Sequence, residues 1–283
     1  MMAKKQQELE EPPPTTLTTK AEQKKVEERV AIGAHVVHET IRREGEDELK
    51  RSSQALAWSG LAAGLSMGFS LVAEALLAGH LPERPWAPLI SKLGYSVGFL
   101  IVILGRQQLF TENTVTVVLP LLLRKNMQTT LQVLRLWCVV LGANLVGTFL
   151  FAVCIQRIPI FSPEMQRAFT SVSQASAGFD FWVVLIRAVF AGWLIALMVW
   201  LLPAAENSHV SIIIIITYLI GLGGFSHVVA GSTKMFYLVV TGAMTWGAYF
   251  GHFFAPCLIG NILGGVSLVA ALGHAQVVAG KES

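Results

Sequence analysis

The sequence predicts an all-α membrane protein: six transmembrane helices in two inverted three-span repeats, with broken second and fifth spans. Three observations lead to this prediction. The chain is 53% hydrophobic and only 14% charged, whereas soluble proteins carry about 25% charged residues. Six long apolar stretches follow one another, and two of them are interrupted by polar, glycine-containing sequence at matching places in the two halves.

The charges are concentrated near the N-terminus. Ten of the 21 Lys and Arg residues lie in the first 51 positions. We therefore expect residues 1–50 to form a cytoplasmic tail, residues 51–275 the membrane domain and residues 276–283 a short cytoplasmic C-terminal tail. Within the first tail, apolar residues recur at helical spacing and predict an amphipathic helix: Val26, Val30, Val37 and Ile41. The pattern leaves open whether this helix lies on the membrane or packs beneath the membrane domain.

Each element of the membrane domain follows from length. A helix needs about 20 apolar residues to cross the ~30 Å hydrocarbon core. The predicted spans are 55–79, 88–122, 130–155, 181–203, 210–242 and 248–272. The second and fifth are too long for one helix and contain the polar breaks Gly105–Asn113 and Gly223–Lys234. Irregular backbone at membrane depth must be buried in protein or line a water-filled cavity, so these breaks are the best site candidates.

Orientation follows from the basic residues near the span ends. The N-terminal tail is basic, Arg124 and Lys125 follow the second span, and Lys281 follows the sixth. Cytoplasmic loops carry an excess of Lys and Arg. Both termini are therefore expected on the cytoplasmic side.

The two halves share internal spacing. Gly105 precedes Thr111 by six residues, and Gly221 precedes His227 by six. A shared Asn-x-x-Gly pattern follows each break: Asn144 with Gly147, and Asn261 with Gly264. Because each half has an odd number of spans, the second half must be inverted. Inverted repeats of this kind place the permeation site near the midplane, between the two broken helices.

Four motifs resemble one known family. They are Leu109-Phe110-Thr111, Gly224–Ala230, Gly142–Gly147 and Pro256–Gly265. Over roughly residues 50 to 275 the chain resembles the formate/nitrite transporter family, and within it the long-tailed YfdC-like inner-membrane branch. The resemblance implies an aquaporin-like protomer in the cell inner membrane, assembled as a homopentamer with one pore per protomer. It also implies passage of formate, nitrite, hydrosulfide or short carboxylates, so the expected function is a channel for small monovalent acids or anions.

Departures from the family pattern keep other functions open. Gln108 replaces an acidic residue, Gly192 replaces an asparagine, and the lysine that attracts anions before the fourth span has no counterpart among residues 176–180. The alternative is therefore a channel for a small neutral solute, such as water or ammonia, on the same fold. A third possibility, suggested by the charged tail, is a non-transporting partner or scaffold.

His227 is the main candidate for the substrate pathway, together with Thr111 and Lys234. Burial disfavours a charged imidazole, but an arriving anion can stabilise imidazolium or take a proton and pass as the neutral acid. His227 and Thr111 could instead only bridge the loops or cap a helix. Lys234 either attracts anions or pairs with Glu112 or Glu74. Arg106 and Arg187 are expected to pair with the same two acids.

Five apolar residues align with positions that narrow the pore in the family, although each could equally be ordinary core. They are Leu109, Phe110, Tyr95, Phe99 and Ile220. Apolar constrictions can gate by dewetting. No spacing indicates a metal site, and no nucleotide-binding or nucleophile motif is found. We therefore expect no enzymatic activity, no cofactor and no nucleic-acid partner; the partners are the permeant acid or anion and the lipid bilayer.

Overall fold

The computed structural model describes residues 33–268 and residue 271, and in this part of the chain every regular element is helical. The chain divides into two compact units, Met1–Gly33 and Ala34–Ser283, and the second is described below. Val26 and Val30 of the expected amphipathic helix, and the C-terminal tail 276–283, lie outside the described residues.

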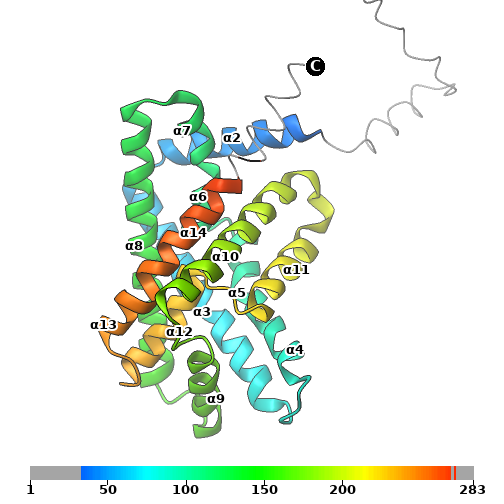
Figure 1. Ribbon diagram of the computed structural model, residues 1–283, viewed down its shortest axis with the longest axis vertical. Coiled ribbons are helices and arrows are strands. Elements are labelled where there is room, and N and C mark those ends of the chain that lie inside the picture. The colour runs from blue at the N-terminus through cyan, green and yellow to red at the C-terminus, as the bar shows by residue number, and fades with distance from the viewer. Residues whose placement is uncertain (1–32, 269–270, 272–283) are drawn as a thin grey trace, which may run out of the picture. The chain divides into compact units, whose positions relative to one another are not determined.

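The helices follow one another with short connections (Figure 1). In the first half they are α2 (Ala34–Lys50), α3 (Ser53–His80), α4 (Ala87–Ser91), η1 (Lys92–Tyr95), α5 (Ser96–Leu104), α6 (Phe110–Thr116), α7 (Val118–Arg124) and α8 (Met127–Arg157). In the second half they are α9 (Pro163–Gln174), α10 (Phe181–Leu201), η2 (Leu202–Ala204), η3 (Glu206–Ser208), α11 (His209–Leu222), α12 (Val228–Val240), α13 (Trp246–Ala248), the π-helical turn η4 (Tyr249–Phe254) and α14 (Ala255–Leu268).

Five helical segments in the described chain are long and apolar enough to cross a membrane. They are Ser53–His80, Ala87–Leu104, Met127–Arg157, Phe181–Ala204 and Trp246–Leu268. The helices α11 and α12 are apolar but shorter. A chain with this many apolar helices is a multi-pass membrane protein. The first expected break separates α5 from α6, and the second separates α11 from α12.

Close backbone contact joins two helix pairs, α3 with α8 and α10 with α14. A β-carbon at Gly147 of α8 would lie 2.6 Å from the Leu61 carbonyl oxygen of α3. In the other pair, a β-carbon at Gly264 of α14 would lie 2.8 Å from the Trp193 amide nitrogen of α10. Glycine lets these backbones approach closely, as at many helix interfaces in membranes. The two pairs form the frame that holds the broken segments.

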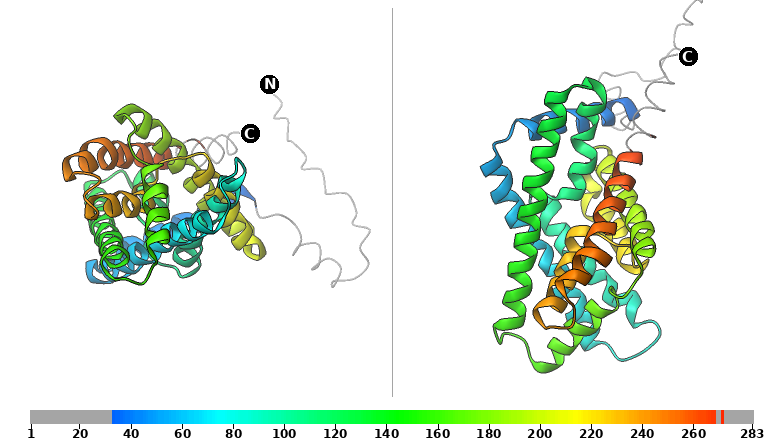
Figure 2. Two further views of the ribbon diagram at one scale, coloured as in Figure 1. Left: turned by 90° about the horizontal axis from the view of Figure 1, so that it is seen from below. Right: turned by 60° about the vertical axis from the view of Figure 1, so that its left-hand side comes forward.

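The amphipathic helix α2 packs against the membrane helices, which resolves the alternative that the sequence left open. Its apolar residues Val37 and Ile41 are buried in a cluster with Val199 of α10. Figure 1 and Figure 2 show α2 across one end of the helix bundle and α9 at the other. Arg135 of α8 donates hydrogen bonds to the Leu49 carbonyl oxygen, at 2.9 Å, and to the Arg51 carbonyl oxygen, at 3.0 Å.

The outer face of α2 is covered by ion pairs. Glu39 accepts hydrogen bonds from Arg42 and Arg43, and these guanidinium groups lower the pKa of Glu39 to about 2. Glu46 pairs with Arg124 at 2.8 Å, and Glu44 with Arg106 at 3.5 Å. The pairing of Arg106 with Glu112 expected from the sequence is therefore wrong, because Arg106 reaches the α2 surface instead.

We predict that Gly147→Ala destabilises the protein, because its methyl group would force α3 and α8 apart. Overpacking of this kind costs about 1–3 kcal/mol. The matched control is Gly142→Ala on the same helix, where nothing lies within 4 Å of an added β-carbon; there alanine should be neutral or gain up to about 1 kcal/mol of helix propensity. The midpoint temperature of unfolding in detergent measures both. Equal midpoints for the two variants would contradict the close-contact interpretation.

Candidate functional site

The two breaks have nearly the same backbone path. Gly105 ends α5 and Gly223 ends α11, and the next residue of each break is left-handed: Arg106 has φ 51° and Gly224 has φ 62°. The residue before each following helix is extended, with φ −104° and ψ 126° at Leu109 and φ −113° and ψ 125° at His227. The first half therefore tolerates a side chain where the second has glycine.

Two buried asparagines hold these breaks in place. Asn144 of α8 donates to the carbonyl oxygens of Gln108, at 2.9 Å, and Gly60, at 2.8 Å, and accepts from the Phe110 amide at 2.9 Å. The first break is thereby tied to α8, which carries Asn144, and to α3, which carries Gly60. The asparagine side chains satisfy backbone groups that lipid could not satisfy.

Asn261 of α14 repeats this arrangement in the second half. It donates to the carbonyl oxygens of Ser226, at 2.9 Å, and Ala188, at 2.8 Å, and accepts from the Val228 amide at 2.8 Å. Both asparagines are fully buried. Each amide group uses both of its N–H donors and its oxygen, so neither side chain can rotate without breaking several hydrogen bonds.

These hydrogen bonds correct the register between the halves. The sequence spacing matched Thr111 with His227. In the structure Leu109 takes the position of His227, since both precede the helix that follows their break. Their carbonyl oxygens likewise accept from the residue four positions later, Asn113 and Gly231 respectively. The match of Thr111 with His227 was counted from Gly105 and Gly221, and it is wrong because these two glycines are not equivalent. The residue equivalent to Gly105 is Gly223.

His227 is the last residue of the second break before α12 and is 1% exposed. Its Nδ1 accepts a hydrogen bond of 3.2 Å from the Ala230 amide, which caps the start of α12. Because Nδ1 acts as the acceptor, a neutral ring carries its proton on Nε2. This Nε2–H donates to Thr111 Oγ1 at 2.7 Å. The ring of Phe99 meets the imidazole edge to face, with 5.0 Å between centroids. His227 and Thr111 are thus brought together from the two halves.

The five apolar candidates are all buried but occupy different surroundings. Tyr95 packs on Phe99, with ring centroids 5.3 Å apart, and Phe99 in turn contacts His227. Phe110 packs edge to face against Trp137 of α8 at 5.8 Å. Tyr95 and Ile220 line a cavity next to His227, while Leu109 is fully buried in the core.

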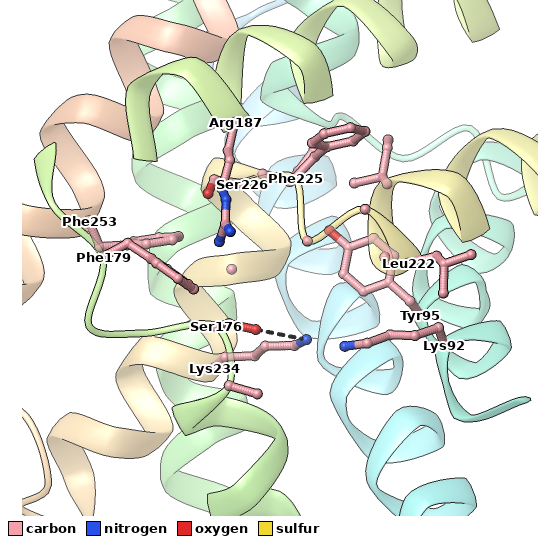
Figure 3. Close-up of a pocket in the computed structure, with 17 residues that line it drawn as sticks. Lys92, Tyr95, Ser176, Phe179, Arg187, Leu222, Phe225, Ser226, Lys234 and Phe253 are labelled. Atoms are coloured by element: carbon pink, nitrogen blue, oxygen red, sulfur yellow. Dashed lines mark hydrogen bonds between the residues drawn. The ribbon is translucent and has the colours of Figure 1, made fainter. Parts of the chain in front are cut away.

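This cavity has a volume of about 320 Å³, which is room for a small anion together with several waters. Figure 3 shows the side chains that surround it. Polar groups from five segments of the chain converge there: Lys92, Ser176, Arg187, Ser226, His227 and Lys234. The aromatic residues that complete the lining are Tyr95, Phe179, Phe225 and Phe253.

One buried carboxylate, Glu74 of α3, is shared by two lysines that line the cavity. Lys234 Nζ lies 2.7 Å from Glu74 Oε2, and Lys92 forms an ion pair with Oε1 of the same group. Lys234 also donates to Ser176 Oγ at 3.4 Å. Of the two alternatives for Lys234, the structure shows the ion pair with Glu74. Because two ammonium groups share one carboxylate, the cluster retains one net positive charge.

Arg187 does not pair with Glu74 or Glu112, so that expectation is wrong. Its guanidinium lies over the ring of Phe179, with Cζ 3.9 Å from the centroid, and its side chain points into the cavity (Figure 3). Sequence reasoning missed both Lys92 and Arg187 as lining residues. A cation inside an apolar helix is a signal for a functional site, and Arg187 carries that signal. Lys92 lies near the start of the predicted second span, 88–122, where a lysine is ordinary because its long side chain can reach the membrane surface.

The described residues contain no group of three or more His, Cys, Asp or Glu side chains that could hold a metal ion. The arrangement combines a basic cavity, apolar walls and one imidazole whose two ring nitrogens both have partners.

Comparisons with known proteins agree on one family. A model of the formate/nitrite transporter family matches residues 35–275. The inner membrane protein YfdC of Escherichia coli K12 is 43% identical over 251 residues, covering 89% of this chain and 81% of that protein. The formate channel BtFdhC of Bacillus thuringiensis is 27% identical over 241 residues, covering 82% of this chain and 91% of that protein.

Solved structures show the same fold. The structure of a pentameric formate channel with formate bound superimposes with a TM-score of 0.65 at 17% identity, covering 80% of this chain and 98% of that one. A second structure, of an FNT family ion channel, gives a TM-score of 0.62 at 17% identity, covering 86% and 95% of the two chains. With a family match across most of its length and a relative of 43% identity, the chain belongs to the formate/nitrite transporter family.

Proposed function

We propose that this protein is a membrane channel for small monovalent acids or anions, such as formate or nitrite, with proton exchange at His227. The observation that carries the proposal is the position of His227, which links the two breaks and lines a cavity containing three cationic side chains. Family membership supports it, as does the relative named a formate channel.

The proposed architecture has six spans in two inverted three-span repeats, with an aquaporin-like protomer. In this arrangement α5, α6 and α7 together make the second span, and α11 and α12 the fifth. The matched hydrogen bonds of Asn144 and Asn261 support the repeat, as do the matched close contacts of Gly147 and Gly264.

We further propose a homopentamer in the cell inner membrane, with both termini cytoplasmic. The pentamer is supported by the formate channel of similar fold, and the membrane by the relative named an inner membrane protein. In this scheme residues 1–50 form the cytoplasmic tail, residues 51–275 the channel domain and residues 276–283 the C-terminal tail. Residues 34–50 of that tail pack against the channel helices.

The proposed pathway starts in the basic cavity. The net positive charge of Lys92, Lys234 and Glu74 attracts an anion, and the aromatic walls then strip part of its water shell. At His227 a proton added to the ring must reside on Nδ1, since Nε2 already carries one. That step requires the Ala230 amide to release Nδ1. A neighbouring anion offsets the cost of the buried charge, accepts this added proton and moves on as the neutral acid, which returns the ring to its Nε2–H form and lets the Ala230 amide bond to Nδ1 again.

We predict that His227→Ala abolishes the pH dependence of formate uptake into proteoliposomes. In the wild type, uptake should rise as the external pH falls from 7 to 5, because a proton accompanies each anion. In the variant, uptake at pH 5 should fall by about tenfold or more, equivalent to ~1.4 kcal/mol in the barrier. Stopped-flow light scattering measures both rates.

His80→Ala is the matched control, since His80 is exposed at the end of α3. It should transport like the wild type. Uptake by His227→Ala with wild-type rate and pH profile would contradict proton exchange at this residue. Rapid passage of water or ammonia, with no formate or nitrite uptake by the wild type, would identify a neutral-solute channel instead.

A second prediction separates the structural role of Lys234 from a role in the substrate pathway. Glu74→Gln leaves Lys234 buried without its counter-charge, and removing one partner of a buried pair costs about 3–5 kcal/mol. We therefore expect a lower unfolding midpoint for Glu74→Gln and recovery of most of the loss in the double variant Glu74→Gln/Lys234→Met.

Formate uptake by the folded double variant then tests the pathway. The double variant keeps the net positive charge of the cluster, because Lys92 remains and Glu74 and Lys234 are lost together. If the ammonium group of Lys234 itself binds the anion, uptake should therefore fall severalfold although the midpoint has recovered. Wild-type uptake in the double variant would show that Lys234 serves only to hold α12 against α3 through Glu74. The midpoint is measured in detergent and the uptake in liposomes made from the same preparation.

A further inference from the structure

Arg187 differs from the other cations of the cavity because none of the carboxylates in the described residues pairs with it. Lys92 and Lys234 share Glu74. Within the described chain, by contrast, no carboxylate lies within ion-pair distance of Arg187. Its guanidinium group instead contacts the face of the Phe179 ring. A guanidinium carries five N–H donors in its plane and no acceptor. Stacking occupies only one face, so the donor edges remain available.

The backbone of Arg187 is fixed relative to the central histidine. The next residue, Ala188, accepts a hydrogen bond from Asn261 Nδ2, and the same amide group donates to the Ser226 carbonyl oxygen. One asparagine therefore positions both the helix that carries Arg187 and the loop that carries Ser226 and His227. Phe179 limits the rotation of the guanidinium, so little conformational entropy is lost when it binds a ligand.

The space beside the guanidinium is kept open by Gly224. The heavy atom nearest to a β-carbon built at Gly224 is Arg187 Nη1, at 3.9 Å. The equivalent position in the other break is Arg106, which has the same left-handed backbone with a full side chain. This conformation is strained for a residue with a side chain, but Arg106 shows that it can accommodate one. A longer side chain there would occupy the region between Arg187 and the loop.

We propose that Arg187 is the specificity residue of the channel, forming an oxyanion subsite at the approach to His227. The proposal rests on the function proposed above and names the class of anion that this site prefers. A planar guanidinium matches two oxygens attached to one atom, and it binds carboxylates through two parallel hydrogen bonds. Formate and nitrite present two such oxygens. Hydrosulfide and chloride present a single centre and gain only the attraction of the charge.

The arrangement in Figure 3 fits this role: Arg187, Ser226 and Lys234 come from three different helices or loops and surround the same space. Three cations line the cavity, Lys92, Lys234 and Arg187, and in the described chain Glu74 is the carboxylate that pairs with two of them. Together these four side chains carry a net charge of two positive charges. An anion held at Arg187 neutralises one of them. It lies then in the cavity that His227 also lines.

The test compares Arg187→Lys with the wild type in proteoliposomes at one fixed pH, using formate, nitrite, hydrosulfide and chloride as probes. Lysine keeps the charge and removes the planar fork. We expect formate and nitrite permeability to fall about tenfold while hydrosulfide and chloride change by less than about twofold. Arg187→Gln, which also removes the charge, should lower the permeability of every anion that the wild type conducts.

Arg167→Lys is the matched control: Arg167 lies on the surface of α9 and pairs with Glu164, so all permeabilities should stay at wild-type values. Equal losses for all four anions in Arg187→Lys, or no loss for any, would overturn the oxyanion subsite while leaving the proposed channel function intact. A wild-type protein that carries none of the four anions would overturn both proposals.

A binding measurement answers the same question without permeation. In detergent, formate should raise the unfolding midpoint of the wild type more than chloride does at equal concentration, because a ligand stabilises the state that binds it. The difference should disappear in Arg187→Lys and persist in Arg167→Lys. A formate effect of the same size in all three proteins would count against Arg187 as the binding group.

Discussion

The hydrogen bonds of Asn144 and Asn261 are the interaction on which the rest of the site depends. Each side-chain amide joins a broken segment to a carbonyl oxygen of a neighbouring long helix. In the membrane interior no water can replace these bonds, and each unsatisfied backbone group costs several kcal/mol. The asparagines therefore permit a non-helical backbone at this depth. The positions of Leu109 and His227 follow directly from that support.

The second constraint is charge. Burying ions is costly unless they are paired, and next to the cavity this pairing is incomplete, since one carboxylate, that of Glu74, is shared by two lysines. The excess positive charge is tolerated because the cavity has room for water and for an anion. The opposite end of the bundle is different: there the ions of α2 are balanced by surface partners such as Arg124 and Arg106. At the α2 end the charged side chains are paired with one another, whereas the excess positive charge lies at the cavity.

Much of the fold was predictable because its signals are local. Apolar length gives the long helices, and a polar stretch with glycine inside an apolar run marks a helix break. The sequence also named His227 and Thr111 as candidates for the substrate pathway, and the structure shows their side chains in contact. The exact register between the halves was not predictable. The true equivalent of Gly105 is Gly223, but Gly221 lies only two residues earlier and looks the same in sequence. Only the hydrogen bonds to the asparagines distinguish them.

The parts that sequence could not supply depend on contacts between distant residues. An arginine in an apolar helix needs an explanation, and an acid partner was the simplest one for Arg187. The packing of α12 and η1 against α3 decides which lysines pair with Glu74. Spacing along the chain does not encode that packing. The stacking of Arg187 on Phe179 likewise joins a helix to the loop before it. Sequence identified the charged residues, and packing assigned their partners.

The packing of α2 has a consequence for biosynthesis. Its apolar cluster includes Val199 and Leu268, which are translated long after α2 itself. At 5–20 residues per second, the roughly 220 intervening residues take about 10 to 45 s to synthesise. During that time the apolar face of α2 has no complete docking surface, while its ion-paired face, with Glu39, Arg42 and Arg43, keeps the segment soluble. Docking of α2 is thus completed late in assembly, because it requires that α14 is already in place.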